Sequence, residues 1–135
     1  MANALYDKGR EGFLDGSIDW DTNDIRVCLV KSTYTPTLAS DTYMSTITAH
    51  DNGRSAALTS KTVTAGVADA ADTTLTATAA SACNALVVFQ HTGVDATARL
   101  IAYIDTPTSG LPFTPSASQT VNITWDNGAN KVFKL

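Results

Sequence analysis

The sequence predicts an all-β protein: a single jelly-roll-like β-sandwich with a short N-terminal helix and a C-terminal β-hairpin. Glu11 is the only glutamate among the 13 acidic residues, and aspartate favours turns and caps where glutamate favours helix interiors. Threonine, a strand former, is abundant along the chain. Short apolar runs are separated by turns rich in Asp, Asn and Gly. At 135 residues the chain has the size of one domain.

Residues 4–14 are expected to form the N-terminal helix. Its apolar and small residues recur at helical spacing, and they are Leu5, Gly9, Gly12, Phe13 and Gly16. Glycine costs about 1 kcal/mol in a helix interior, so we expect this helix to need close docking against a sheet or a neighbouring subunit. A turn-rich stretch follows, which divides the domain into a helix-and-turn segment, residues 1–24, and the sandwich, residues 25–135.

The expected strands follow this segment in order. Patterns of apolar residues predict them at residues 25–31, 55–60, 61–65, 73–79, 85–91, 99–105, 120–125 and 131–135. Residues 40–47 are expected to form one or two helical turns, which end at a turn over residues 51–53. The last two strands flank Asn127 and Gly128, a pair typical of a type I′ turn, and this pattern predicts the C-terminal hairpin.

Composition and charge exclude several classes of protein. The formal net charge is -4, whereas a nucleic-acid-binding protein needs a basic face. No apolar run approaches the roughly 20 residues of a transmembrane helix, and the N-terminus lacks the apolar core of a signal peptide. Cys28 and Cys83 lie in apolar strand-like runs, which favours buried free thiols over a disulfide. We therefore expect a soluble protein made in the host cytoplasm, with no nucleic-acid or membrane partner.

The candidate catalytic and metal-binding residues form no recognisable motif, so we expect no enzymatic activity, no cofactor and no metal. His50 and His91 are the only histidines, and the cysteines do not have the spacing of a zinc site. The sequence has neither a nucleophile elbow nor a glycine loop that cradles phosphate. Residues 19–24 begin like a calcium loop, but Asp24 stands where that loop needs glycine and Val30 where it needs glutamate. We interpret this segment as a solvated turn.

Three stretches of the chain together form a pattern that is similar to known sequences. They are residues 6–14 with 18–20, residues 100–105 with 110–112, and residues 124–135, of which the W-D-N-G sequence at 125–128 is the most specific. In these stretches the chain resembles a family of small virion proteins of tailed bacteriophages, whose members look like capsid decoration, or cement, proteins. The resemblance implies a protein on the capsid surface that binds the major capsid protein lattice and stabilises the head. Closed symmetry is the default for soluble oligomers, so we expect a homo-oligomer. A trimer, which suits the local threefold positions of an icosahedral lattice, is favoured over a dimer, which suits the twofold positions.

Large apolar side chains near the N-terminus are the candidates for contact with the capsid or a second subunit: Leu5, Tyr6, Phe13, Leu14 and Trp20. They lie on a segment too rich in glycine to be stable alone. The alternative is that these side chains only cover one open end of the sandwich. A different functional class is a tail-associated or host-recognition module, which would bind a receptor or glycan through exposed loop aromatics such as Tyr34 and Phe113.

Overall fold

The computed structural model describes residues 3–105, 113–129 and 131–135. In chain order its elements are β1 (Ala4–Leu5), α1 (Asp7–Asp15), β2 (Ile25–Lys31), the 3-10 helices η1 (Met44–Thr46) and η2 (Thr48–His50), β3 (Asp51–Arg54), β4 (Thr62–Thr64), β5 (Val67–Asp69), β6 (Thr73–Thr76), β7 (Cys83–Gln90), β8 (Leu100–Ile104), β9 (Thr120–Ile123) and β10 (Phe133–Lys134). The protein is therefore mostly β with one short α-helix, and this part of the prediction is confirmed.

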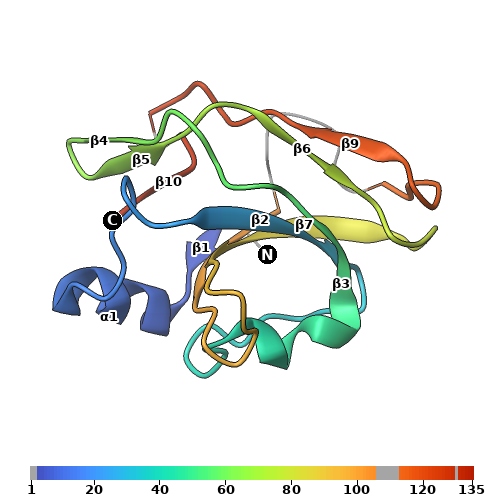
Figure 1. Ribbon diagram of the computed structural model, residues 1–135, viewed down its shortest axis with the longest axis horizontal. Helices are drawn as coiled ribbons and strands as arrows, with labels where there is room; N and C mark the ends of the chain where they lie inside the picture. The colour runs from blue at the N-terminus through green and yellow to red at the C-terminus, as the bar shows by residue number, and fades with distance from the viewer. Residues whose placement is uncertain (1–2, 106–112, 130) are drawn as a thin grey trace.

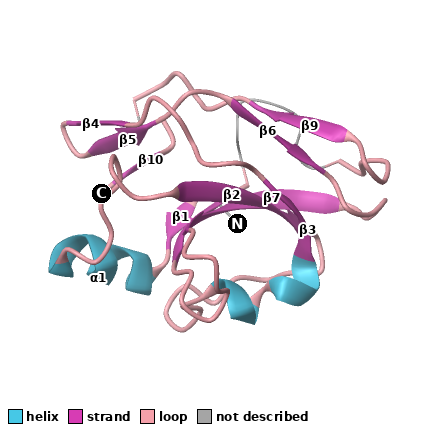
Figure 2. Ribbon diagram, viewed as in Figure 1, coloured by secondary structure: helices cyan, strands magenta, loops and turns pink. Residues whose placement is uncertain are grey.

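The strands form antiparallel sheets in two layers (Figure 1). The first layer is a five-stranded sheet with the order β1-β8-β7-β2-β3. A three-stranded sheet, β10-β5-β4, and a two-stranded sheet, β6-β9, form the second layer over one face of the first. The α-helix and the 3-10 helices lie on the other side of the five-stranded sheet (Figure 2).

The central strands of the five-stranded sheet are buried on both faces. On β2, Val27 and Leu29 belong to the core between the two layers. Cys28 and Val30 belong to a second core, which includes Met44 of η1. Because both faces are covered, β2, β7 and β8 are almost continuously apolar instead of strictly alternating. Both cysteines are free and buried, as their sequence context predicts.

The N-terminal helix forms, but it begins later than predicted. Ala4 and Leu5 make β1, which pairs antiparallel with β8, so the helical prediction is wrong for its first residues. The Tyr6 N–H continues this pairing, because it donates to the Ile101 carbonyl at 2.9 Å. The helix starts after Tyr6 and ends at Gly16, whose φ of 81° lies in the left-handed region typical of a helix C-terminus.

The C-terminal hairpin does not form, and this prediction is wrong. β9 pairs with β6 whereas β10 pairs with β5, so the last two strands belong to different sheets. Gly128 is not one of the positive-φ glycines of the described residues, and its N–H donates to the Asp126 carboxylate at 3.0 Å. Positive φ at two consecutive turn residues, which a type I′ turn requires, occurs instead at Ala65 (53°) and Gly66 (78°), between β4 and β5.

Residues 51–53, which were expected to form a turn, belong to strand β3. Its pairing with β2 is irregular, with Cys28 opposite Arg54 and Val30 opposite Asp51. The remaining differences concern neighbouring segments. Residues 55–60 form no named strand, and β5 was not expected at all.

Arg54, the last residue of β3, holds two carboxylates. Its Nε donates to Asp51 at 2.7 Å, and its terminal nitrogens donate to the two Asp95 oxygens at 2.8 and 2.9 Å. The guanidinium also lies 5.5 Å from the centre of the Phe89 ring. Hydrogen bonds from Arg54 lower the pKa of Asp95 below its ordinary value of 3.8.

We expect the Asp95–Arg54 pair to contribute acid sensitivity. Because the pKa of Asp95 is lower in the folded state than in the unfolded state, its stabilising contribution is present above the unfolded pKa and is lost as the pH falls through the folded pKa. Urea unfolding should give Asp95→Asn a lower free energy of unfolding than the wild type at about pH 6. The difference in free energy between the two proteins should shrink at about pH 2.5. A difference that stays constant with pH would contradict the role of the pair.

Candidate interaction surface

Two glycines allow α1 to lie directly against its neighbours. A Cβ atom at Gly9 would lie 2.8 Å from the Leu100 carbonyl oxygen and 2.9 Å from the Ile101 Cα on β8. A Cβ atom at Gly12 would lie 2.4 Å from Cδ1 of Ile18. Both glycines are buried, so the small-residue stripe of the helix is its docking face against the sheet and the following turn.

The five contact candidates differ in how much of each side chain the fold exposes. Leu5, Tyr6 and Trp20 are only 7 %, 0 % and 4 % exposed, so they belong to the cores of the chain itself. Phe13 is partly buried against the core, whereas Leu14 is 87 % exposed. For Leu5, Tyr6 and Trp20 this burial agrees with the alternative that they cover the interior. Leu14 and Phe13 remain accessible to another molecule.

A groove of about 250 Å³ lies where the end of α1 meets the three-stranded sheet, and we call it the α1 groove. It is lined by residues of α1, the following turn, the β4–β5 hairpin and the C-terminus, among them Phe13, Trp20, Val63, Phe133 and Leu135. These segments are far apart in the sequence. The groove is therefore a product of the tertiary structure.

Aromatic side chains pack against one another inside the α1 groove. The ring of Trp20 meets that of Phe133 edge-on, with 5.2 Å between their centres. Phe13 also packs on Phe133, with 5.8 Å between the ring centres. The Trp20 Nε1–H donates to the Asp69 carbonyl at 3.1 Å, which holds the indole in place. The groove thus has preformed, well-packed walls.

Two exposed apolar side chains, Val63 and Leu135, belong to the lining of the α1 groove. Among the described residues, the large hydrophobic side chains that are exposed are Leu14, at 87 %, and Val63, Val94 and Leu135, each at 58 %. Val63 and Leu135 line the groove, and Leu14 follows the lining residue Phe13 on α1. Clustered exposed apolar side chains mark protein interaction sites. Sequence reasoning missed Val63 and Leu135 because no local pattern places β4 and the C-terminus beside α1.

The acidic turn at residues 19–24, beside the α1 groove, is held by hydrogen bonds among its own residues. A hydrogen bond between the carboxyl groups of Asp19 and Asp21 lowers the pKa of Asp19 and raises the pKa of Asp21. The Asp19 N–H donates to the Asn23 side chain at 2.8 Å, and Lys61 Nζ donates to the Asn23 carbonyl. Across the described ranges, no group of three or more His, Cys, Asp or Glu residues is placed to hold a metal ion. These contacts support the interpretation of residues 19–24 as a solvated turn.

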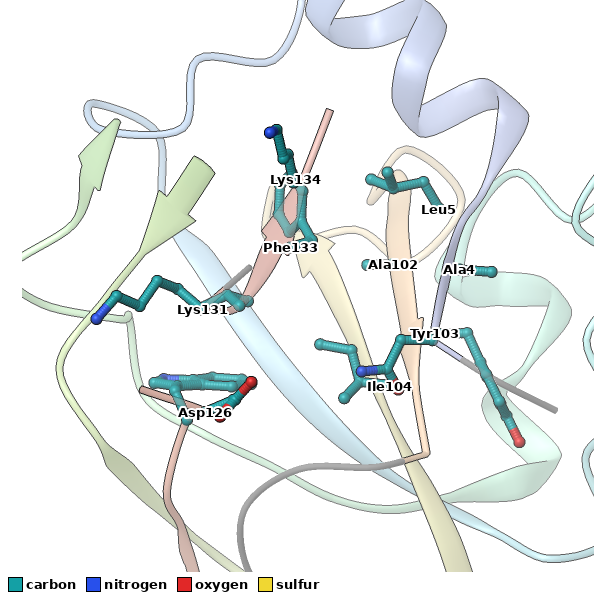
Figure 3. Close-up of a pocket in the computed structure, with 12 residues that line it drawn as sticks. Ala4, Leu5, Ala102, Tyr103, Ile104, Asp126, Lys131, Phe133 and Lys134 are labelled. Carbon is teal, nitrogen blue, oxygen red and sulfur yellow. The ribbon is translucent and has the colours of Figure 1, made fainter. Parts of the chain in front are cut away.

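A second pocket, of about 220 Å³, lies between the five-stranded sheet and the C-terminal residues (Figure 3). Ala102 and Ile104 of β8 form part of its apolar lining. Asp126, Lys131 and Lys134 bring charges of both signs to it. This mixed lining singles out no class of ligand, in contrast to the apolar α1 groove.

The loop aromatics considered for host recognition are not freely exposed. Tyr34 is 5 % exposed, its hydroxyl donates to the Asp41 carboxylate at 2.8 Å, and it lies 2.7 Å from the Tyr6 hydroxyl. Burial raises the pKa of Tyr34 far above its ordinary value. Phe113 is half-buried, and its backbone exchanges hydrogen bonds with Cys83 at 2.9 and 3.0 Å. The expectation of an exposed aromatic at Tyr34 is therefore wrong.

Comparison of the chain with protein-family models, curated proteins and solved structures finds no match. In the part of the chain that the structure describes, no helix has both the length and the apolar character needed to cross a membrane.

Proposed function

We propose that this protein is a structural component of the virion of a tailed bacteriophage, where it decorates the capsid surface and stabilises the head. The observation that carries the proposal is the α1 groove, with the exposed Val63 and Leu135 in its lining and the exposed Leu14 next to the lining residue Phe13 on α1, an apolar surface suited to docking on another protein. The sequence resemblance supplies the phage assignment, and the surface supplies the docking role. The partner is the lattice of the major capsid protein.

The composition and layered fold are consistent with this role. Only 16 % of the residues are charged, against about 25 % in typical domains. Most side chains of this protein are therefore uncharged. A contact worth only a few kcal/mol holds a shell together when many copies act in parallel. The jelly-roll-like sandwich is part of the same proposal, and the two layers of antiparallel strands support it.

The Leu14→Lys variant is expected to bind heads at least about ten-fold more weakly than the wild type. Burial of a leucine at an interface contributes about 1.5–3 kcal/mol, and each 1.4 kcal/mol corresponds to roughly a factor of ten in affinity. Lysine at the C-terminal end of α1 interacts favourably with the helix dipole, so the fold should be retained. Co-sedimentation with heads that lack the decoration protein measures the bound fraction.

Val94→Lys is the matched control, because Val94 is also exposed but lies in the loop between β7 and β8, whereas Leu14 is on α1 directly after the groove-lining Phe13. It should bind heads like the wild type. Equal binding by both variants, or equal loss in both, would refute docking through the α1 groove. Deletion of residues 1–20 is a poorer test, because it removes β1 and the buried Trp20.

The tail-associated or host-recognition role is distinguished by copy number. A decoration protein repeats with the capsid lattice and is present in many copies, whereas a tail module is present in far fewer. The burial of Tyr34 removes one of the two aromatic residues on which that alternative rested. We therefore retain the decoration role as the proposal.

A further inference from the structure

The outer edge of β4 is backbone that no other described strand covers. β4 is the last strand of the β10-β5-β4 sheet, at the edge of the second layer (Figure 1). Its residues Thr62, Val63 and Thr64 are all exposed. Edge strands are usually protected from pairing by charged residues, proline or bulges. β4 contains neither a charged residue nor proline.

The backbone groups of Val63 point toward this open edge. The two-residue turn at residues 65–66 makes Thr64 and Val67 the pair that closes the hairpin, and in a two-residue hairpin the closing pair is the hydrogen-bonded one. Bonded and non-bonded pairs alternate along an antiparallel ladder. The next pair, Val63 and Ala68, is therefore non-bonded, and the Val63 N–H and C=O face away from β5.

The pairing of β5 with β10 leads to the same result independently. The Val132 N–H donates to the Ala68 carbonyl at 3.1 Å, and the Leu135 N–H donates to the Gly66 carbonyl at 2.9 Å. Ala68 thus directs its backbone groups to β10 and not to β4. Its partner Val63 is left with one donor and one acceptor on the open edge.

The edge sequence is complementary to itself. Thr62-Val63-Thr64 reads the same in both directions, so an antiparallel second copy places Val63 opposite Val63 and Thr62 opposite Thr64. In this register Lys61 faces Ala65 of the second copy, and no two like charges lie opposite each other. A two-fold interface requires this kind of self-complementarity.

We propose that two copies of this chain associate by antiparallel pairing of β4 with β4 about a two-fold axis at Val63. The pairing joins two three-stranded sheets into one continuous sheet. The Val63 side chains, each 58 % exposed in the single chain, lie side by side on one face of it. Because Val63 lines the α1 groove, the two grooves adjoin on that face. The dimer replaces the trimer favoured by lattice symmetry, and it does not depend on the virion assignment.

Thiol cross-linking tests the axis directly. Opposed residues of a hydrogen-bonded antiparallel pair have Cα atoms about 5.5 Å apart, so Val63→Cys should be joined efficiently by a short bis-maleimide. Val94→Cys is the matched control, with the same 58 % exposure of the native side chain, and it should stay uncross-linked at equal concentration. The two native cysteines are buried and serve as an internal control. Equal cross-linking of the two variants would overturn the proposal.

Val63→Pro tests the hydrogen bonds of the pair. Proline removes an N–H that faces away from β5, the one described strand that pairs with β4, so the fold should persist while the dimer dissociation constant rises at least about ten-fold. Sedimentation equilibrium measures this constant, and circular dichroism checks the fold. A wild-type monomer at high micromolar concentration, a trimer, or a Val63→Pro protein that dimerises like the wild type would each overturn the proposal. Leu14→Lys should remain a dimer, which separates this test from that of capsid docking.

Discussion

Replacing Gly53 by alanine is expected to destabilise the fold by about 2–6 kcal/mol. The φ of Gly53 is 124°, in the left-handed half of backbone space, and a strained residue there costs about 1–3 kcal/mol. A Cβ atom at this position would also lie 2.3 Å from the Thr76 carbonyl oxygen at the end of β6. Because that oxygen is backbone, room can be made only by moving the layers apart, which adds about 1–3 kcal/mol.

The buried side chain of Asn52 explains why β3 cannot easily move away from β6 at Gly53. Its Nδ2 donates to the Ala79 carbonyl at 3.1 Å, and its Oδ1 accepts the Ala79 N–H at 2.8 Å. Its Oδ1 also accepts the Thr78 hydroxyl at 3.1 Å. Asn52 thus ties β3 to the segment after β6, and a shift at Gly53 would disturb these hydrogen bonds as well.

Gly93→Ala is the control for Gly53→Ala. Gly93 has a φ of 88°, but no atom lies within 4 Å of the added Cβ, so only backbone strain of about 1–2 kcal/mol is expected. Thermal unfolding of both variants measures the difference, and Gly53→Ala should melt at the lower temperature. Equal melting temperatures would show that Thr76 does not limit the space at Gly53.

Replacing Trp20 by alanine is expected to cost about 3–5 kcal/mol, the usual range for a large aromatic removed from a core. Trp20 is 4 % exposed and packs edge-on against Phe133, and its Nε1–H donates to the Asp69 carbonyl at 3.1 Å. The change would leave a cavity under the α1 groove. Urea unfolding measures the loss of stability.

Two further variants serve as controls for Trp20→Ala, one for the hydrogen bond to Asp69 and one for an exposed side chain. Trp20→Phe retains most of the apolar contact but removes the hydrogen bond to Asp69, so a loss of about 1 kcal/mol is expected. Leu14→Ala should change stability by less than about 0.5 kcal/mol, because Leu14 is 87 % exposed. If Trp20→Ala were as mild as Leu14→Ala, the aromatic packing would not support the α1 groove.

The proposed dimer would strengthen the proposed docking on the capsid. A dimer formed through β4 carries two α1 grooves on one face, and two linked sites bind a repeating lattice more tightly than either site alone. Val63→Pro should therefore reduce head binding both by removing this second attachment and by changing the groove wall that Val63 lines, while Leu14→Lys acts on the attachment alone. Leu14→Lys, which should remain a dimer, isolates the effect on docking.

The central strands and the docking face of the helix could be predicted from local sequence alone. Strand β2 occupies residues 25–31 as predicted, and β7 and β8 lie within two residues of their predicted bounds. These strands are long apolar runs. A strand that is buried on both faces is expected to be continuously apolar, so the pattern alone indicates a central strand. The stripe containing Gly9 and Gly12 likewise indicated close helix packing, and a Cβ atom at either position would lie within 3 Å of a neighbouring residue.

Which strands pair and which surface stays exposed depends on tertiary contacts between distant segments. After β9, the Trp125 N–H donates to the Asp72 carboxylate at 3.0 Å and its Nε1–H to the Ala71 carbonyl at 3.1 Å. These bonds hold the chain beside the start of β6 before it reaches Asn127 and Gly128, so that pair lies in a crossing between sheets. The same assembly of layers buries Trp20 and leaves Leu14 exposed. Such outcomes depend on contacts between distant segments, which local propensity does not encode.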